Sequence, residues 1–431
     1  MKPADARTTP MPTRPSLRGA ARLVTGVACA CGAAVAGAQS SPWYLGLAQS
    51  FGHESNLLRL SVNQPVPDGY SQADSVSSTS LLGGLDQRLG RQRAYANVSV
   101  RNNRYSRNPV FDNTSYSAAA GLDWQTLQRL SGTLSTSAFR NLQRFDSGEF
   151  GFQRLRNLER VSTVNATVSL GLVTQYTLEA TAGRRQVRNS LQDPAVQARE
   201  FTQDNASLGL RWRPSSAAIL GIGLSAAQGR YPKFRQLADG SYDADRFKRQ
   251  DIELRGTLQP TGASVFEARL SNGRTRYDLN QQRDFDGLTG SVAWRWQPTG
   301  KLRLNTVFTR ETGQDSYATA VFNVPATTDY SRITNSLRTQ LIHDATAKLQ
   351  FNAALDVYRR TVVRTTPNPF FPLDASGKER TPILSLGARW TPLRYALLGC
   401  DWSRERRSTS GEITADLSAT SFSCFAQATL Q

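Results

Sequence analysis

The chain has 431 residues, with 52 Lys and Arg against 34 Asp and Glu and a formal net charge of +18. Its two histidines and four cysteines do not cluster with carboxylates at metal-ligand spacing, and no glycine-rich phosphate loop joins a strand to a helix. We therefore expect no metal and no cofactor. No segment beyond the N-terminus is apolar for long enough to form a membrane-spanning helix.

Residues 1–38 have the pattern of a secretory signal peptide. Basic residues precede an uncharged stretch from Leu23 to Ala38, which ends in Ala-Gly-Ala. The alternative is an N-terminal membrane anchor, for which the apolar stretch is short. Cleavage would leave residues 39–431 as one domain with a net charge of +14. A basic secreted protein is expected to attract anionic partners such as lipopolysaccharide, anionic glycans or anions in a pore, and not nucleic acid.

The stretch WRWQPTGKLRLNTVF, residues 294–308, predicts a β-hairpin. Apolar residues occupy every second position on both sides of a Pro-Thr-Gly break, so both segments read as strands joined by a tight turn. Trp294 and Trp296 share the apolar face, whereas Arg295 and Arg303 lie on the opposite, polar face. One face of the hairpin therefore suits lipid and the other suits water.

Breaks of this kind recur along the chain, and together they predict an outer-membrane β-barrel. They fall at 124–130, 172–178, 212–218, 258–264, 296–302, 341–347 and 390–396, and they alternate with long polar connections such as 188–202, 231–247, 313–330 and 361–380. Short turns at one end and long loops at the other are typical of transmembrane barrels. The alternative, a soluble β-sandwich, has shorter strands.

The breaks indicate about 18 antiparallel strands, beginning near Trp43 and ending at Leu430. Sixteen is possible, because the first pair of strands and the connection 54–74 are irregular in pattern. An even count places both termini in the periplasm. At either count the lumen is wide enough to hold water unless loops fold into it.

Four tryptophans lie on the apolar face within a few residues of a short turn. They are Trp124, Trp212, Trp296 and Trp390. Aromatic side chains at this depth form a girdle at the membrane–water interface, so these residues are expected at the periplasmic rim.

Arginines gather on the opposite, lumen-facing side of the predicted strands. They are Arg211, Arg213, Arg255, Arg269, Arg295, Arg303, Arg338 and Arg389. Such guanidinium groups could attract anions and bind carboxylates or phosphates. Alternatively, they could tie strands together through acids such as Glu253 and Glu267. Both interpretations stay open at this stage.

Catalytic signals are weak, and the protein is not expected to be an enzyme. His53 falls near the end of the first strand and His343 in a predicted turn, where a structural role is the simpler interpretation. Tyr95 and Tyr358 fall on the polar face, where an aromatic ring could stack on a sugar. Two such residues do not predict a sugar-binding path.

Cys400 and Cys424 are the two cysteines that remain after signal cleavage. Each lies in an alternating apolar run, and the two are placed as cross-strand neighbours on the lipid-facing side of the last strands. In an oxidising compartment this predicts a disulfide. The alternative is two buried thiols that behave as small apolar residues.

Several stretches resemble the EpsL-type, exosortase-associated outer-membrane proteins of extracellular polysaccharide systems. The stretches are LDQRLGRQRAYANVSVRNNRY (85–105), GLDWQ (121–125), GRYP (229–232) and DFDGLTGSVAWRWQPTGKLRL (284–304). The resemblance implies a β-barrel that takes part in exopolysaccharide synthesis and export, without known catalytic residues. One departure is the final Gln431, since many outer-membrane barrels end in an aromatic residue.

The favoured function is therefore assistance in the export of an extracellular polysaccharide across the outer membrane of a Gram-negative bacterium. The alternative is a general or anion-preferring diffusion porin, and a barrel hydrolase is a third candidate. The expected partners are outer-membrane lipid and lipopolysaccharide, with an anionic polysaccharide and periplasmic export proteins if the first function holds.

Overall fold

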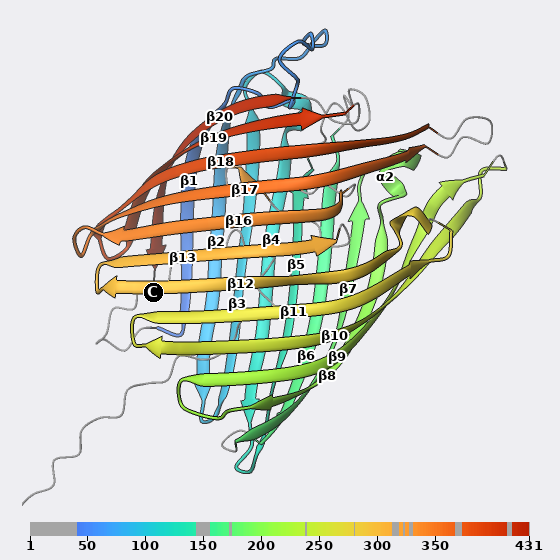
Figure 1. Ribbon diagram of the computed structural model, residues 1–431. Helices are drawn as coiled ribbons and strands as arrows, with labels where there is room; N and C mark the ends of the chain where they lie inside the picture. Colours follow the sequence, from blue (N-terminus) through green and yellow to red (C-terminus); the bar gives the residue numbers. More distant parts are fainter. Residues whose placement is uncertain are drawn as a thin grey trace, which may run out of the picture.

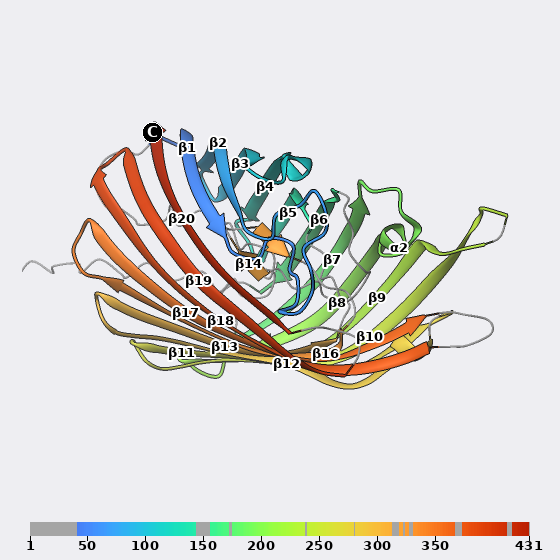
Figure 2. The same ribbon diagram turned by 90° about the horizontal axis from the view of Figure 1, so that it is seen from above.

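A computed structural model describes residues 41–143, 156–171, 175–237, 239–279, 281–312, 319–321, 324–326, 331–366, 373–411 and 416–430. Eighteen antiparallel strands form one sheet, in which each strand pairs with its neighbours in the chain and β1 also pairs with β20. The sheet therefore closes into a barrel (Figures 1 and 2). This confirms the predicted fold class and the count of 18. The predicted signal peptide lies outside the described residues.

The strands of the barrel have the following bounds: β1 (Trp43–Glu54), β2 (Asp74–Leu89), β3 (Gln92–Tyr105), β4 (Asn113–Gln125), β5 (Leu130–Leu142), β6 (Leu158–Leu170), β7 (Tyr176–Asn189), β8 (Phe201–Trp212), β9 (Ala218–Gln236), β10 (Tyr242–Thr261), β11 (Ser264–Tyr277), β12 (Phe285–Thr299), β13 (Leu302–Thr312), β16 (Ser331–Asp344), β17 (Leu349–Thr366), β18 (Leu373–Leu393), β19 (Ala396–Ser410) and β20 (Leu417–Leu430). The helical segments are short: η1 (Pro109–Phe111), α2 (Pro194–Gln197) and η2 (Gln281–Arg283). None of the described helices is long and apolar enough to cross a membrane.

Side chains alternate between the two faces of the wall, as a period of two requires. The outward residues include many exposed apolar side chains, such as Leu208, Leu224 and Leu254, which are 53%, 62% and 51% exposed. The inward residues between them are mostly polar or charged. An apolar exterior around a polar interior is the arrangement of a membrane barrel, because lipid covers the outside and water fills the inside.

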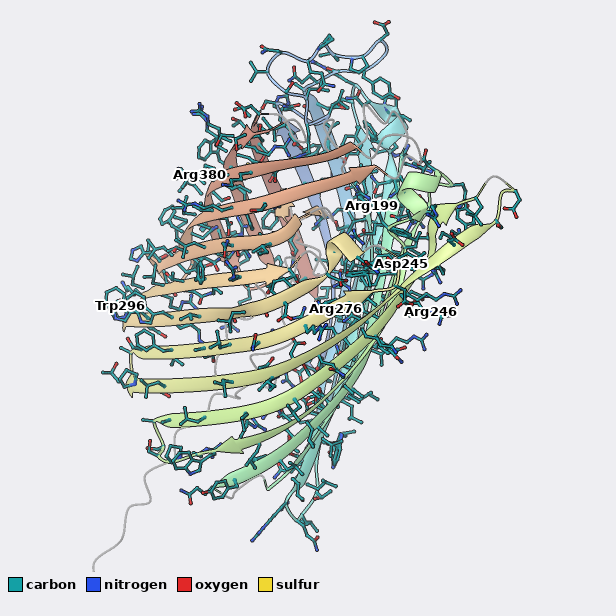
Figure 3. All side chains as sticks on the ribbon, turned by 45° about the vertical axis from the view of Figure 1, so that its right-hand side comes forward. Arg199, Asp245, Arg246, Arg276, Trp296 and Arg380 are labelled. Carbon is teal, nitrogen blue, oxygen red and sulfur yellow. A yellow bond between two sulfur atoms is a disulfide. The ribbon has the colours of Figure 1, made fainter. Side chains whose placement is uncertain are left out.

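The tryptophans lie where the alternation predicts them. Trp212, Trp296 and Trp390 face outward near the short turns and are 39%, 37% and 49% exposed, and Trp43 at the start of β1 is 53% exposed. In Figure 3, Trp296 stands at the end of the barrel where short turns join the strands. Trp124 also faces outward, with its ring against Gly132 of the neighbouring strand.

Two predicted long connections are wrong in extent. The strands β9 and β10 continue into the region 231–247, where Gln236 still pairs with Tyr242, and β17 and β18 continue into 361–380. Beyond the membrane both faces of a hairpin meet water, so the polarity pattern ends although the backbone hydrogen bonds continue. The apolar–polar alternation therefore predicted strands that are shorter than those of the structure.

The connection between β13 and β16 contains a second, two-stranded sheet, β14 (Thr319–Val321) and β15 (Val324–Ala326). β15 contacts β5, which lies on the opposite side of the ring from β13 and β16. Figure 2 shows this small hairpin inside the barrel. This hairpin therefore lies in the lumen against β5, and the sequence had left open whether any loop enters the lumen.

Cys400 and Cys424 are directly opposite each other on β19 and β20 and form a disulfide. Both lie on the outward face, in register with Ala388 on one side and Phe51 of β1 on the other. The bond thus links the last two strands next to the seam where the barrel closes.

Candidate functional site: the lumenal wall

The inward faces of the strands between β8 and β18 carry a band of arginines, each of which is held by an acidic side chain. We call it the arginine band, and it comprises Arg211, Arg255, Arg269, Arg295, Arg303, Arg338 and Arg389. These are seven of the eight arginines predicted to line the lumen. The eighth, Arg213, lies in the turn after β8 and has no ion pair among the described residues.

The strand register explains how the band forms. Glu179 and Glu253 stand in one cross-strand row, and Gly209 and Gly223 occupy the two positions between them. The adjacent row contains Arg211, Gly221, Arg255 and Arg269 in succession. A row of guanidinium groups therefore runs beside a row of carboxylates, and the glycines leave room for the arginine side chains to lie across the wall.

Most of the ion pairs connect neighbouring strands or nearby positions of one strand, and the pair of Arg255 with Glu179 reaches from β10 to β7. They are Arg211 with Glu179 (2.8 Å), Arg255 with Glu179 (3.5 Å) and Glu253, Arg269 with Glu253 (2.5 Å), Arg295 with Glu267, Arg303 with Asp344 (2.8 Å), Arg338 with Asp356, and Arg389 with Asp401 (2.8 Å). Glu179 and Glu253 each hold two arginines, so these pairs form a network across β7 to β11. The pairing fits the interpretation that these arginines tie strands together.

The two members of each pair differ in exposure, however. The arginine side chains from Arg211 to Arg338 are 34–52% exposed, whereas their acidic partners are 5–32% exposed. Only Arg389 reverses the order, at 21% against 34% for Asp401. A solute in the lumen therefore meets guanidinium groups first, with the carboxylates behind them, so a wall of ion pairs can still present positive charge.

The wall formed by β2 to β6 is different, because neutral polar side chains dominate its inward face. Ser78 donates a hydrogen bond to the side-chain oxygen of Asn103 (2.7 Å), and Asn103 donates to Asn113 (3.0 Å) and Ser115 (3.3 Å). All four residues are buried. This cross-strand network satisfies the polar groups without ionised partners.

Toward the long-loop end, ion pairs are buried on both sides. Arg249 pairs with Asp251 at 2.8 Å, and the guanidinium groups of Arg360 and Arg407 lie 3.5 and 3.8 Å from Glu379. None of these side chains is more than 15% exposed. These pairs are covered by other parts of the protein and are not presented to the lumen.

One buried pair fixes the long β1–β2 connection onto the wall. Arg59 donates two hydrogen bonds to Glu405 of β19, at 3.1 and 2.5 Å, and has a positive φ of 54°. Leu60, next to it, is 1% exposed, and Asn56 bonds to both the backbone N–H and the carbonyl of Leu60. No periodic pattern predicts this contact, because it joins an irregular connection to a strand far away in the chain.

Aromatic side chains also gather on the inward face near the long loops, which the sequence did not predict. Phe201, Tyr231, Phe247 and Tyr277 pack together with ring centroids 5.4–6.5 Å apart and are 2–6% exposed. Arg283 of η2 lies over two of these rings, 5.4 Å from the centroid of Tyr231 and 5.9 Å from that of Tyr277. This cluster is a small core against which η2, in the connection between β11 and β12, packs through Arg283. Figure 3 shows Arg199 and Asp245 in this part of the barrel, away from Trp296.

The remaining residues singled out in the sequence are not brought together. His343 faces outward on β16 beside Phe351 of β17, and His53 lies on β1 with its ring 3.0 Å from the Ser75 hydroxyl. Tyr358 is 5% exposed, and Arg93 covers the ring of Tyr95 at 5.5 Å. Among the described residues, no group of three or more His, Cys, Asp or Glu side chains could hold a metal ion.

No family model matches the chain. No curated protein matches it either. The resemblance to EpsL-type proteins therefore stays a prediction.

Three solved barrels illustrate the structural similarity. Pseudomonas aeruginosa OccK2 (OpdF) has a TM-score of 0.49 at 14% identity, covering 90% of this chain and 98% of the other. The outer membrane protein opdK from Pseudomonas aeruginosa has a TM-score of 0.45 at 13% identity, covering 90% and 99%. The FrpB iron transporter from Neisseria meningitidis has a TM-score of 0.45 at 8% identity, covering 91% and 82%. Each comparison spans the barrel as a whole at low sequence identity.

Proposed function

We propose that the protein is an outer-membrane channel for the diffusion of small hydrophilic solutes, with a preference for anions. The observation that carries this proposal is the unequal exposure within the arginine band. Guanidinium groups in a narrow aqueous lumen raise the local concentration of anions. The buried carboxylates hold these groups in place and do not cancel their effect at the lumen surface, where the positive charge is nearer to the solute.

The barrel itself supports the outer-membrane location. Its exterior is apolar, its outward tryptophans lie near the short turns, and its strands β1 and β20 place the two ends of the barrel chain at that same end. In a bacterial barrel the short turns are periplasmic, so the long connections belong to the cell surface.

Polysaccharide export was the function favoured by the sequence resemblance. The described residues support the diffusion channel better, because β15 contacts β5 inside the lumen and Arg59 of the β1–β2 connection is paired with Glu405 on the wall. Both features narrow the path, which suits small solutes more than a polymer. Export therefore stays a prediction from the resemblance alone.

The test is ion selectivity in planar lipid bilayers. The purified protein in a KCl gradient should give a reversal potential of the sign that indicates chloride preference. The preference should weaken as the salt concentration rises, because the Debye length falls to about 3 Å near 1 M. A cation-selective or non-selective pore at low salt would contradict the proposal.

Two variants separate the arginine band from the total charge. The double substitution Arg295→Gln with Arg303→Gln should reduce chloride preference, because both side chains are about half exposed at 52% and 46% and their acidic partners would remain. The control is Arg184→Gln with Arg104→Gln, which removes two positive charges from the outward face, where Arg184 lies 3.6 Å from Asp204 and Arg104 lies 3.3 Å from Asp112. An equal effect of both changes would show that the band has no special role.

Gene deletion distinguishes the channel from the exporter. Loss of the protein should slow the uptake of small anionic solutes and leave the amount of extracellular polysaccharide unchanged. Reduced surface polysaccharide with normal solute uptake would favour the export function instead.

A further inference from the structure

The outer wall contains a hollow over β16 to β20. Its volume is about 420 Å³, and its lining includes Leu341, Phe351, Ala353, Ala388, Trp402 and Phe422. This size falls within the range of about 300–1,000 Å³ typical of pockets for small ligands. Most of its lining residues face the lipid side of the wall, and Asn352, Gly387 and Asp401 of the same strands complete it.

The hollow arises because small outward residues lie between large ones. One cross-strand row contains Phe351, Ala388 and the Cys400–Cys424 disulfide. The next row toward the long loops contains Leu341, Ala353, Leu386, Trp402 and Phe422. The two alanines and the disulfide leave a depression with aromatic rings around it.

The position of the hollow places it within the membrane. Trp390 pairs with Leu349 and Leu398 in the row one step closer to the short turns than Ala388. Tryptophan at this depth marks the interface between headgroups and hydrocarbon. The hollow above it therefore faces acyl chains. Its outward lining is mostly aromatic and aliphatic, and His343 lies at its edge beside Phe351.

Basic residues lie in the two short turns directly below the hollow. Lys348 ends the β16–β17 turn, and Arg394 lies in the β18–β19 turn. The Lys348 ammonium donates a hydrogen bond to the carbonyl of Pro392 (2.9 Å), which brings it to the turn that carries Arg394. The nearest acid in these turns, Asp344, is paired with Arg303 at 2.8 Å. The turns therefore offer positive charge at the level of lipid phosphates.

We propose that this surface is a binding site for an anionic phospholipid of the periplasmic leaflet. The phosphate-containing headgroup contacts Lys348 and Arg394, and one acyl chain fills the hollow between Phe351, Trp402 and Phe422. The site binds one lipid through two kinds of contact, charge at the turns and apolar packing above them. It does not depend on the proposed channel function.

The test is native mass spectrometry of the purified full-length barrel, released from detergent after titration with phosphatidylglycerol or phosphatidylcholine. The wild-type protein should retain one phosphatidylglycerol in preference to phosphatidylcholine. The double substitution Lys348→Gln with Arg394→Gln should lower the affinity for phosphatidylglycerol roughly 30-fold, because each basic residue near an anionic lipid surface contributes about fivefold. Its affinity for phosphatidylcholine should change little.

The hollow is tested by Ala388→Leu, which should lower the affinity for both lipids by filling the space for the acyl chain. Ala353→Leu is a second variant of the same kind, and whichever variant retains the heat-modifiable mobility of a folded barrel is used. The control is Arg91→Gln with Arg129→Gln, which removes two positive charges from the β2–β3 and β4–β5 turns on another part of the rim. It should leave the affinity for phosphatidylglycerol unchanged.

Three results would overturn the proposal. Retention of phosphatidylglycerol by the Lys348 and Arg394 double variant would show that the turns do not bind the headgroup. An unchanged affinity in a folded Ala388→Leu or Ala353→Leu protein would exclude the hollow. A dimeric mass that Ala388→Leu converts to a monomer would show that a second copy of the chain occupies the hollow.

Discussion

The two sides of the lumen use different chemistry to provide partners for their inward polar side chains. In the wall of β2 to β6, here called the neutral wall, most inward polar groups bond to neutral partners, as between Ser78, Asn103 and Asn113. Its exposed ion pair, Arg93 with Asp86, is the exception among the described residues. The arginine band on β8 to β18 satisfies its members with ion pairs to acids of the same or nearby strands. Both arrangements connect neighbouring strands, but the second gives the lumen many more charged side chains. The electrostatic potential across the channel therefore differs from one side to the other.

Glycines serve different purposes on the two sides. Gly121, on the neutral wall, lies under the ring of Tyr95, whose nearest atom would be 2.3 Å from an added Cβ. Gly221, in the arginine band, would place a Cβ no closer than 3.4 Å to the Arg211 side chain. One glycine accommodates an aromatic ring, as in cross-strand aromatic pairing with glycine. The other leaves space between arginines.

The largest effect is expected where a buried acid loses both of its arginines. Arg255→Ala with Arg269→Ala leaves Glu253, which is 5% exposed, without either cation that holds it. Removing the partner of a buried charge costs about 3–5 kcal/mol, so the free energy of unfolding should fall strongly. Urea unfolding in lipid vesicles, followed by tryptophan fluorescence, measures the change.

Adding Glu253→Gln to that double variant should restore much of the lost stability, because no buried charge then remains. On the neutral wall, Asn103→Ala should cost less, about 1–3 kcal/mol for the unsatisfied partners. If Asn103→Ala and the arginine double variant lowered the free energy of unfolding equally, the two walls would not differ in how strongly their partners stabilise the barrel.

The next effect concerns the glycines. Gly121→Ala should lower the free energy of unfolding by about 1–3 kcal/mol, because the ring of Tyr95 must move to admit the methyl group. Gly221→Ala should change it little, since its nearest contacts are at ordinary van der Waals distance. Parallel urea titrations compare the two, and a greater loss for Gly221→Ala would contradict the structural explanation.

The smallest effect should come from adding charge to the neutral wall. Asn97 shares the inward face of β3 with Tyr95 and is exposed to the lumen. Asn97→Arg should increase chloride preference modestly, because the new guanidinium faces the same solution as the arginine band. The control is Asn102→Arg, on the outward face of β3. Bilayer reversal potentials measure both, and equal shifts would indicate an effect of total charge alone.

The alternation of apolar and polar residues was sufficient to predict the barrel, its 18 strands and its first and last residues, Trp43 and Leu430. These features depend on local pattern and on short turns. The extents of the β9–β10 and β17–β18 hairpins were not predictable in this way, because strands outside the membrane have no apolar face.

The candidate site was predictable only in part. Inward positions followed from the period of two, so Arg255 and Arg269 could be placed on the lumenal face. Their shared partner Glu253, and the lower exposure of that partner, depend on the register between strands and on the glycines beside them. The aromatic cluster around Tyr231 was not predicted. Its rings occupy inward positions, where the barrel pattern leads one to expect polar side chains, and they are buried there because a connection between strands covers them.

The bond between Arg59 and Glu405 joins residues 346 positions apart. Such a contact cannot form until β19 is in place and the ring is nearly complete, so it belongs to the last stage of assembly. Interactions absent from the folding transition state slow unfolding without accelerating folding. The pair is therefore expected to slow the opening of the closed barrel. The β1–β2 connection adds this kinetic stability only after the ring has closed.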